Sequence, residues 1–181
     1  MIKYLVLIFS ILLGVGCENT IPRKPVSQSK DEQIKASIQR NKKINKQQQK
    51  AIRKVIDKDV ELSYKTSPVG YSYAIKRKSS STISPKRGDE VNFVYRIESL
   101  NGETIYDEME LGEVNYLVDK EDLLPALRYA VKDLKVGEIG VFLMPSFLGY
   151  GYQGDGNKVE INQPLRFTIQ LNSISQNISK D

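Results

Sequence analysis

The spacing of hydrophobic and polar residues changes near residue 64. Upstream, residues 29–61 contain no glycine or proline, and their apolar residues recur at helical intervals, which predicts one long helix. Ser29 and Glu32 have the spacing of a capping box at its start. Apolar residues become dense only near its end, at Ala51, Ile52, Val55 and Ile56. We therefore expect that end to pack against other structure and the Lys- and Gln-rich stretch 40–50 to be solvated.

Downstream, the pattern is that of an antiparallel sheet with one helix. Residues 91–98 alternate apolar and polar side chains, as a half-buried strand does. Asn101-Gly102 is a strong hairpin signal, because both residues tolerate positive φ, and a helix is predicted over residues 123–134. Other strands are predicted at residues 70–75, 104–106, 114–118, 139–144 and 165–174. Four to six antiparallel strands wrapped around one short helix define an α+β domain.

The N-terminus predicts export and a lipid anchor. Lys3 precedes an apolar run of about 10 residues, too short for a transmembrane helix, which needs about 20, and typical of a signal peptide. The run ends in Gly-Val-Gly before Cys17, which resembles the lipobox of bacterial lipoproteins. The resemblance implies cleavage after residue 16 and acylation of Cys17, in the cell envelope on the periplasmic side or at the outer membrane. A secreted protein with a free Cys17 is the alternative.

The charge divides the rest of the chain into two parts. Residues 22–58 contain 12 Lys and Arg against 3 Asp and Glu, a net charge of +9. Residues 59–181 contain 14 against 18, a net charge of −4. We expect a signal peptide at 1–16, a lipid-anchored tether and basic helix at 17–58, and a globular domain at 59–181. The basic part could lie on anionic headgroups, at about 1 kcal/mol per basic residue, or serve only as a solubilising spacer. Nucleic acid is not an expected partner of an exported lipoprotein.

The composition excludes several kinds of catalytic site. The chain has no His, no Trp and one Cys, so it cannot form a Ser-His-Asp triad, a Cys-His pair or a zinc site built on His. The Asp155-Gly156-Asn157 stretch lacks the ligand spacing of a calcium loop. We therefore expect no metal and no cofactor. Aromatic and aliphatic residues at the ends of the predicted elements suit an apolar pocket instead.

An ordered set of short motifs resembles the FKBP-type peptidyl-prolyl cis/trans isomerases. The resemblance spans about residues 64–174, and it rests on the order and spacing of pieces that are weak singly. They are residues 85–91, Tyr95, Asn101-Gly102, residues 105–107, 123–127 and 134–138, Pro145 with Tyr150-Gly151, and residues 162–167. With the lipobox and the basic helix, the chain resembles the gliding-motility-associated lipoprotein isomerases of the Bacteroidetes.

The resemblance implies an apolar cup that binds proline-containing segments of exported or cell-surface proteins. The implied catalytic residues are Tyr95, Asp107 and Tyr150. Asp107 would orient polar groups through the Tyr95 hydroxyl, and the Tyr150 hydroxyl and the Val159 backbone N–H would donate to substrate carbonyls. The implied pocket residues are Tyr106, Tyr116, Leu123, Leu124, Leu127, Val159 and Phe167.

Two departures from the family pattern leave an alternative function open. Leu127 stands where many relatives have Trp, and Glu160-Ile161 replaces the usual Pro-Pro. We expect a lipid-anchored isomerase that assists folding of exported proteins, with a role in cell-surface motility implied by the resemblance. The alternative is a non-catalytic module that binds proline segments, or a periplasmic chaperone. The apolar stripe of the basic helix is too sparse for a strong coiled coil, and the oligomeric state stays open.

Overall fold

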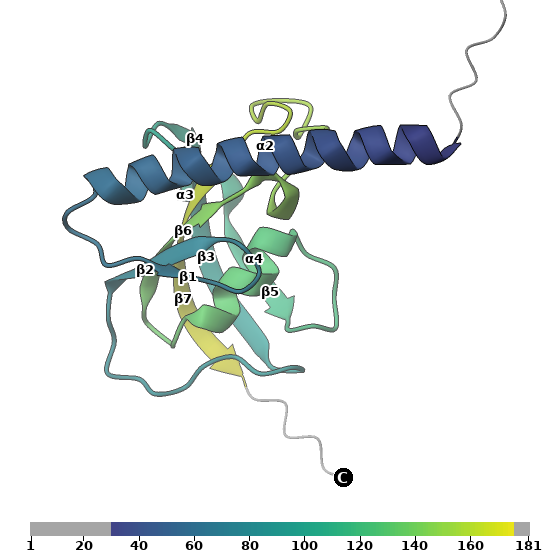
Figure 1. Ribbon diagram of the computed structural model, residues 1–181. Coiled ribbons are helices and arrows are strands. Elements are labelled where there is room, and N and C mark those ends of the chain that lie inside the picture. The colour runs from purple at the N-terminus through teal and green to yellow at the C-terminus, as the bar shows by residue number, and fades with distance from the viewer. Residues whose placement is uncertain (1–29, 176–181) are drawn as a thin grey trace, which may run out of the picture. The chain divides into compact units, whose positions relative to one another are not determined.

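The computed structural model describes residues 30–175 (Figure 1). The chain divides into two compact units, residues 1–36 and 37–181, and the fold below is that of the second. Helix α2 (Lys30–Lys58) confirms the long helix predicted from the sequence, and from Ser37 onward it belongs to the second unit. The predicted signal peptide and Cys17 lie outside the described residues.

The described residues of the second unit contain an antiparallel sheet of seven strands, which confirms the α+β class but exceeds the four to six strands predicted. The strand order is β1-β2-β6-β7-β3-β4, with β5 paired to β3. The additional strand, β1, has two exposed residues and so gives no periodic signal. The strands are β1 (Lys65–Thr66), β2 (Ser72–Arg77), β3 (Glu90–Ser99), β4 (Thr104–Tyr106), β5 (Glu113–Leu117), β6 (Ile139–Met144) and β7 (Leu165–Ser175).

The helix predicted over residues 123–134 is divided into two shorter elements. These are α4 (Pro125–Ala130) and the 3-10 helix η1 (Val131–Asp133). Leu124 stays outside the helix, with φ −48° and ψ 127°, because the ring of Pro125 disfavours helical geometry in the preceding residue. Two other short helices, α3 (Glu108–Leu111) and η2 (Ser146–Leu148), were not predicted, since four and three residues are too few to show a helical period.

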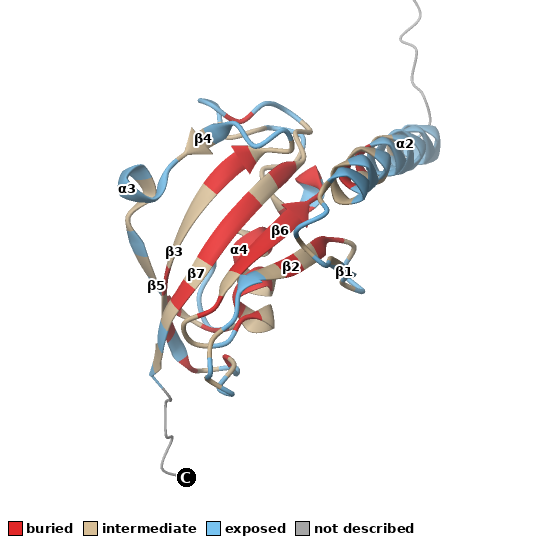
Figure 2. Cartoon of the chain, turned by 90° about the vertical axis from the view of Figure 1, so that its left-hand side faces the viewer, coloured by how far each residue is buried: buried red, intermediate tan, exposed pale blue. Residues whose placement is uncertain are grey.

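One face of the sheet forms the main core with α4 and η1 (Figure 2). Phe142 of β6 lies opposite Phe167 of β7, and both side chains are fully buried. Leu134, just after η1, is equally buried, and a Cβ added at Gly140 would come within 2.7 Å of its side chain. Each large apolar side chain buried in this way stabilises the fold by about 1.5–3 kcal/mol.

The second half of α2 contacts the rest of its unit. Ile52 is 1% exposed, which confirms that the apolar end of the helix packs. Gln48 is also buried, at 6% exposure, although it lies in the stretch predicted to be solvated. Its amide makes three hydrogen bonds, and these offset the loss of water. No helix within residues 30–175 is long and apolar enough to cross a membrane.

Candidate active site

Three of the predicted tyrosines come together at one end of the sheet. Tyr95 lies on β3, Tyr106 ends β4, and Tyr150 follows η2, and each is partly buried against the main core. Burial, followed by the nearby Tyr95, Asp155 and Tyr106, raises the pKa of Tyr150 to about 12. Burial also raises the pKa of Tyr95. The three phenols and one carboxylate therefore share one electrostatic environment.

The other predicted pocket residues lie in two layers. Leu123 and Leu124 are partly exposed and, like the three tyrosines, pack against the core. A deeper layer belongs to the core itself and leaves at most 5% of each residue exposed. It consists of Tyr116, Leu127, Val159 and Phe167. The structure thus places an accessible rim of tyrosine and leucine over an apolar floor.

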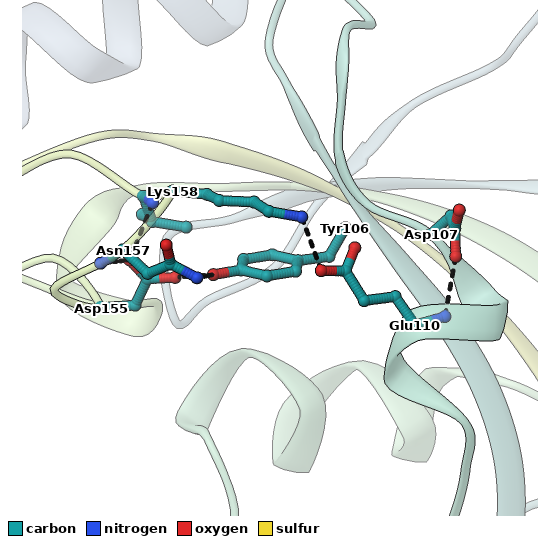
Figure 3. Close-up of polar contacts among 7 residues, drawn as sticks. Tyr106, Asp107, Glu110, Asp155, Asn157 and Lys158 are labelled. Atoms are coloured by element: carbon teal, nitrogen blue, oxygen red, sulfur yellow. Dashed lines mark hydrogen bonds and ion pairs between the residues drawn. The ribbon is translucent and has the colours of Figure 1, made fainter.

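Asp155 forms the centre of the polar contacts at the rim (Figure 3). Its carboxylate accepts a hydrogen bond from the Tyr106 hydroxyl at 2.5 Å and from the backbone N–H groups of Asn157 and Val159, each at 2.8 Å. Burial alone would raise the pKa of Asp155, but these three bonds outweigh it and hold the pKa below its ordinary value. The sequence does not predict this role, since the Asp155-Gly156-Asn157 stretch is considered there only for calcium and lacks the ligand spacing for it. Its turn-forming Asp-Gly-Asn sequence was the available signal.

These contacts change two of the predicted hydrogen bonds. Asp107 accepts the Glu110 N–H at 2.8 Å and so caps α3. Within the described residues it makes no bond to the Tyr95 hydroxyl. The first turn of α3 follows Asp107 directly and offers the nearest free donors. The Val159 N–H is engaged by Asp155, so it is not free for a substrate carbonyl.

Lys158 connects α3 to the Asp155 turn across the face of Tyr106. The Lys158 ammonium lies 4.6 Å from the centre of the Tyr106 ring and 2.5 Å from Glu110 Oε1, as Figure 3 shows. The hydrogen bond to Glu110 raises the pKa of Lys158. Because the groups are exposed, the ion pair itself adds little stability. The ion pair instead holds α3 and the Asp155 turn together across the Tyr106 ring.

Among the hydrogen-bond donors at the rim that have no partner within residues 30–175, three could face a substrate. Two are the hydroxyls of Tyr95 and Tyr150, which were predicted. The third is the Leu124 N–H, a donor that the sequence does not predict. Leu124 lies outside α4 because Pro125 begins that helix. In the same residues, no group of three or more His, Cys, Asp or Glu could hold a metal ion. The site therefore offers neutral donors over an apolar floor.

Comparison with known proteins assigns this arrangement to a family. The family model of the FKBP-type peptidyl-prolyl cis-trans isomerases matches residues 81–172. FK506-binding protein 2 of Dictyostelium discoideum is 28% identical over 108 residues, which cover 59% of this chain and 79% of that protein. The chain belongs to the FKBP-type peptidyl-prolyl cis-trans isomerase family, as its motifs predicted.

Solved structures show the same fold at low sequence identity. FkpA from Escherichia coli superposes with a TM-score of 0.59 at 19% identity, covering 96% of this chain and 71% of its own. A peptidyl-prolyl cis-trans isomerase from Pseudomonas syringae pv. tomato gives a TM-score of 0.60 at 18% identity, covering 75% of this chain and 96% of its own. The finer resemblance to motility-associated lipoproteins stays a prediction.

Proposed function

We propose that this chain is a lipid-anchored prolyl isomerase that acts on proline-containing segments of exported or cell-surface proteins. The observation that carries the proposal is the rim of three tyrosines over an apolar floor, with the hydroxyls of Tyr95 and Tyr150 free to donate. Isomerisation forms and breaks no covalent bond, so the reaction needs no nucleophile.

The site lowers the barrier by favouring the twisted amide. Rotation about an X–Pro bond faces a barrier of about 18–20 kcal/mol and takes tens of seconds or more uncatalysed. The planar amide is more polar than the twisted one, so an apolar floor favours the twisted state relative to water. Donors such as the Tyr150 hydroxyl and the Leu124 N–H add stabilisation where they reach the substrate carbonyls. A total of about 5 kcal/mol would accelerate rotation several thousandfold.

The decisive experiment measures cis/trans exchange in a Leu-Pro or Phe-Pro peptide with the full chain in a mild detergent. We expect acceleration, and we expect Tyr150→Phe to lower kcat/KM about tenfold, the effect of one lost hydrogen bond of ~1.4 kcal/mol. Tyr152→Phe is the matched control. Because Tyr152 is 76% exposed, this substitution should leave the rate unchanged. Absence of acceleration by the parent chain would refute catalysis.

The second candidate is a module that binds proline segments without turning them over. It is favoured by two departures from the family pattern, Leu127 in the floor where many relatives have Trp and Glu160-Ile161 in place of Pro-Pro. Peptide affinity measured on the same preparation separates the two functions. Micromolar binding without rate enhancement would select the binding module or chaperone over the isomerase.

The anchor rests on the signal peptide pattern and the lipobox before Cys17. Cys17→Ser should abolish incorporation of labelled palmitate and release the protein from the membrane fraction. Unchanged labelling would exclude Cys17 as the acylated residue. The resemblance to motility-associated lipoproteins supports clients in a cell-surface motility machinery. A rate-deficient variant should then impair gliding of the source bacterium, and normal gliding would contradict that role.

A further inference from the structure

Gln48 of α2 is a buried polar residue whose side-chain amide makes three hydrogen bonds. Its Nε2 donates to Ser146 Oγ at 2.9 Å and to the Asn162 carbonyl at 2.7 Å. Its Oε1 accepts the Ser146 N–H at 2.9 Å. Gln48 is 6% exposed and Ser146 is 5% exposed. Burying an amide is unfavourable unless it is hydrogen-bonded, so this geometry specifies glutamine here.

The two partners of Gln48 are the two ends of the segment that carries the site. Residues 146–162 contain Tyr150, the Asp155 turn and Val159. Within the segment, the Gly151 N–H donates to the Ser146 carbonyl, and the Asn162 N–H donates to the Gly151 carbonyl, each at 2.8 Å. Gln48 therefore closes a hydrogen-bonded set around Gly151, the residue that directly follows Tyr150.

Leu148 buries one side of this part of the segment in the core, but the side that faces α2 has little apolar packing. Phe147 is 50% exposed and Tyr152 is 76% exposed. Both line an open groove of about 600 Å³ together with Gln48, Gly151 and residues of α2. Asn162 also has a left-handed backbone, with φ 54°, a conformation that asparagine adopts more readily than most residues other than glycine. Hydrogen bonds to Gln48 thus fix the side of the segment that the buried Leu148 and Val159 do not hold.

We propose that Gln48 is a positioning residue for the isomerase reaction. It acts from a helix outside the family-matched region, residues 81–172, by fixing the segment that aims the Tyr150 hydroxyl. Helix α2 is then part of the working enzyme and not only a spacer. This inference rests on the proposed isomerase activity.

The first test compares three single variants of the full chain in detergent. Gln48→Ala should lower kcat about tenfold while KM changes less than twofold. The reason is that the Tyr150 hydroxyl loses its orientation, whereas the apolar floor that binds the substrate remains. Gln47→Ala makes the same chemical change on an exposed residue of α2 and should have no effect. Gln49→Ala removes a bond from α2 to the Gly70 carbonyl at 2.7 Å. An equal loss in this variant would attribute the effect to general docking of α2 and would overturn the role of Gln48.

The second test asks whether Gln48 acts through Tyr150. In a Tyr150→Phe background, Gln48→Ala should lower kcat by less than a further twofold. A tenfold loss in both backgrounds would show that Gln48 does not act through the Tyr150 hydroxyl and would refute the proposal. If Gln48→Ala fails to fold, Ser146→Ala replaces it in both tests, since that variant removes only the Oγ partner.

Amide hydrogen exchange gives a readout that does not depend on activity. The Gly151 and Asn162 amides should exchange at least tenfold faster in Gln48→Ala than in Gln47→Ala. Unchanged exchange would show that Gln48 does not hold the segment and would refute the inference. An inactive parent chain would refute the proposed function, whereas the exchange result would still decide whether Gln48 positions these residues.

Discussion

Replacing Asp155 by alanine tests whether this carboxylate organises the site. The change removes the acceptor for three donors and leaves the Val159 N–H without a partner beside a side chain that is 95% buried. Hydrogen bonds to charged groups contribute about 1.5–3 kcal/mol each, but Asp155 is partly exposed, so we take about 0.5–1 kcal/mol per bond. The expected loss in unfolding free energy is therefore ~2 kcal/mol.

The assay pairs thermal unfolding with isomerase kinetics on the full chain. We expect Asp155→Ala to lower Tm by about 4–8 °C and kcat/KM by about five- to tenfold, because Tyr106 and the Val159 backbone lose their orientation. Asp155→Asn keeps an acceptor oxygen and should fall between this variant and the parent chain.

Asp107→Ala is the informative comparison. It removes a helix cap worth about 0.5–1 kcal/mol from α3, which has four residues, and should change kcat/KM less than twofold. If Asp107→Ala impaired catalysis more than Asp155→Ala did, Asp107 would be the functional carboxylate that the family resemblance implied. The assignment of Asp155 to that role would then be wrong.

Two further predictions concern the same segment. Gly154→Ala should destabilise the fold by more than ~2 kcal/mol in denaturant unfolding, because φ is +68° and the new Cβ would lie 2.3 Å from the Val159 carbonyl oxygen. Gly156→Ala, with φ +74° and no atom within 4 Å, should lose only about 1–2 kcal/mol, and equal losses would contradict this account. Since the pKa of Tyr150 rises from 10.0 to about 12 on folding, its hydroxyl should stay protonated and kcat should be level from pH 7 to 10. Its contribution to stability should be complete below pH 10 and should disappear as the pH rises to about 12, and a fall in kcat near pH 8 would argue against Tyr150 as the donor.

The strands and the family could be predicted because their signals are local. The alternation over residues 91–98 corresponds to β3, observed as Glu90–Ser99. The Asn101-Gly102 hairpin joins β3 to β4, and Gly102 has the positive φ that such a turn requires. Side chains on an alternating strand must face either the core or the solvent, so this part of the fold follows from the order of residues alone.

The polar contacts could not be predicted because their partners are distant in sequence. Gln48 is 98 residues from Ser146 and 114 residues from Asn162, and a glutamine among lysines is usually solvated. Asp107 and Asp155 each lie within three residues of a tyrosine in the sequence, and the sequence alone does not tell which carboxylate meets a tyrosine hydroxyl. In the structure the Asp107 side chain caps α3, so Asp155 is the carboxylate that accepts the tyrosine hydroxyl.

The floor of the site is also the centre of the hydrophobic core, and this constrains how substrate preference can change. Leu127 and Phe167 are each at most 1% exposed, so a smaller residue there would leave a cavity costing about 2–5 kcal/mol. A larger one would strain the same packing. Changes in preference are therefore confined to Leu123, Leu124 and the exposed positions of the 146–162 segment, such as Phe147 and Tyr152. Selection can vary those exposed positions without lowering the stability of the sheet beneath them.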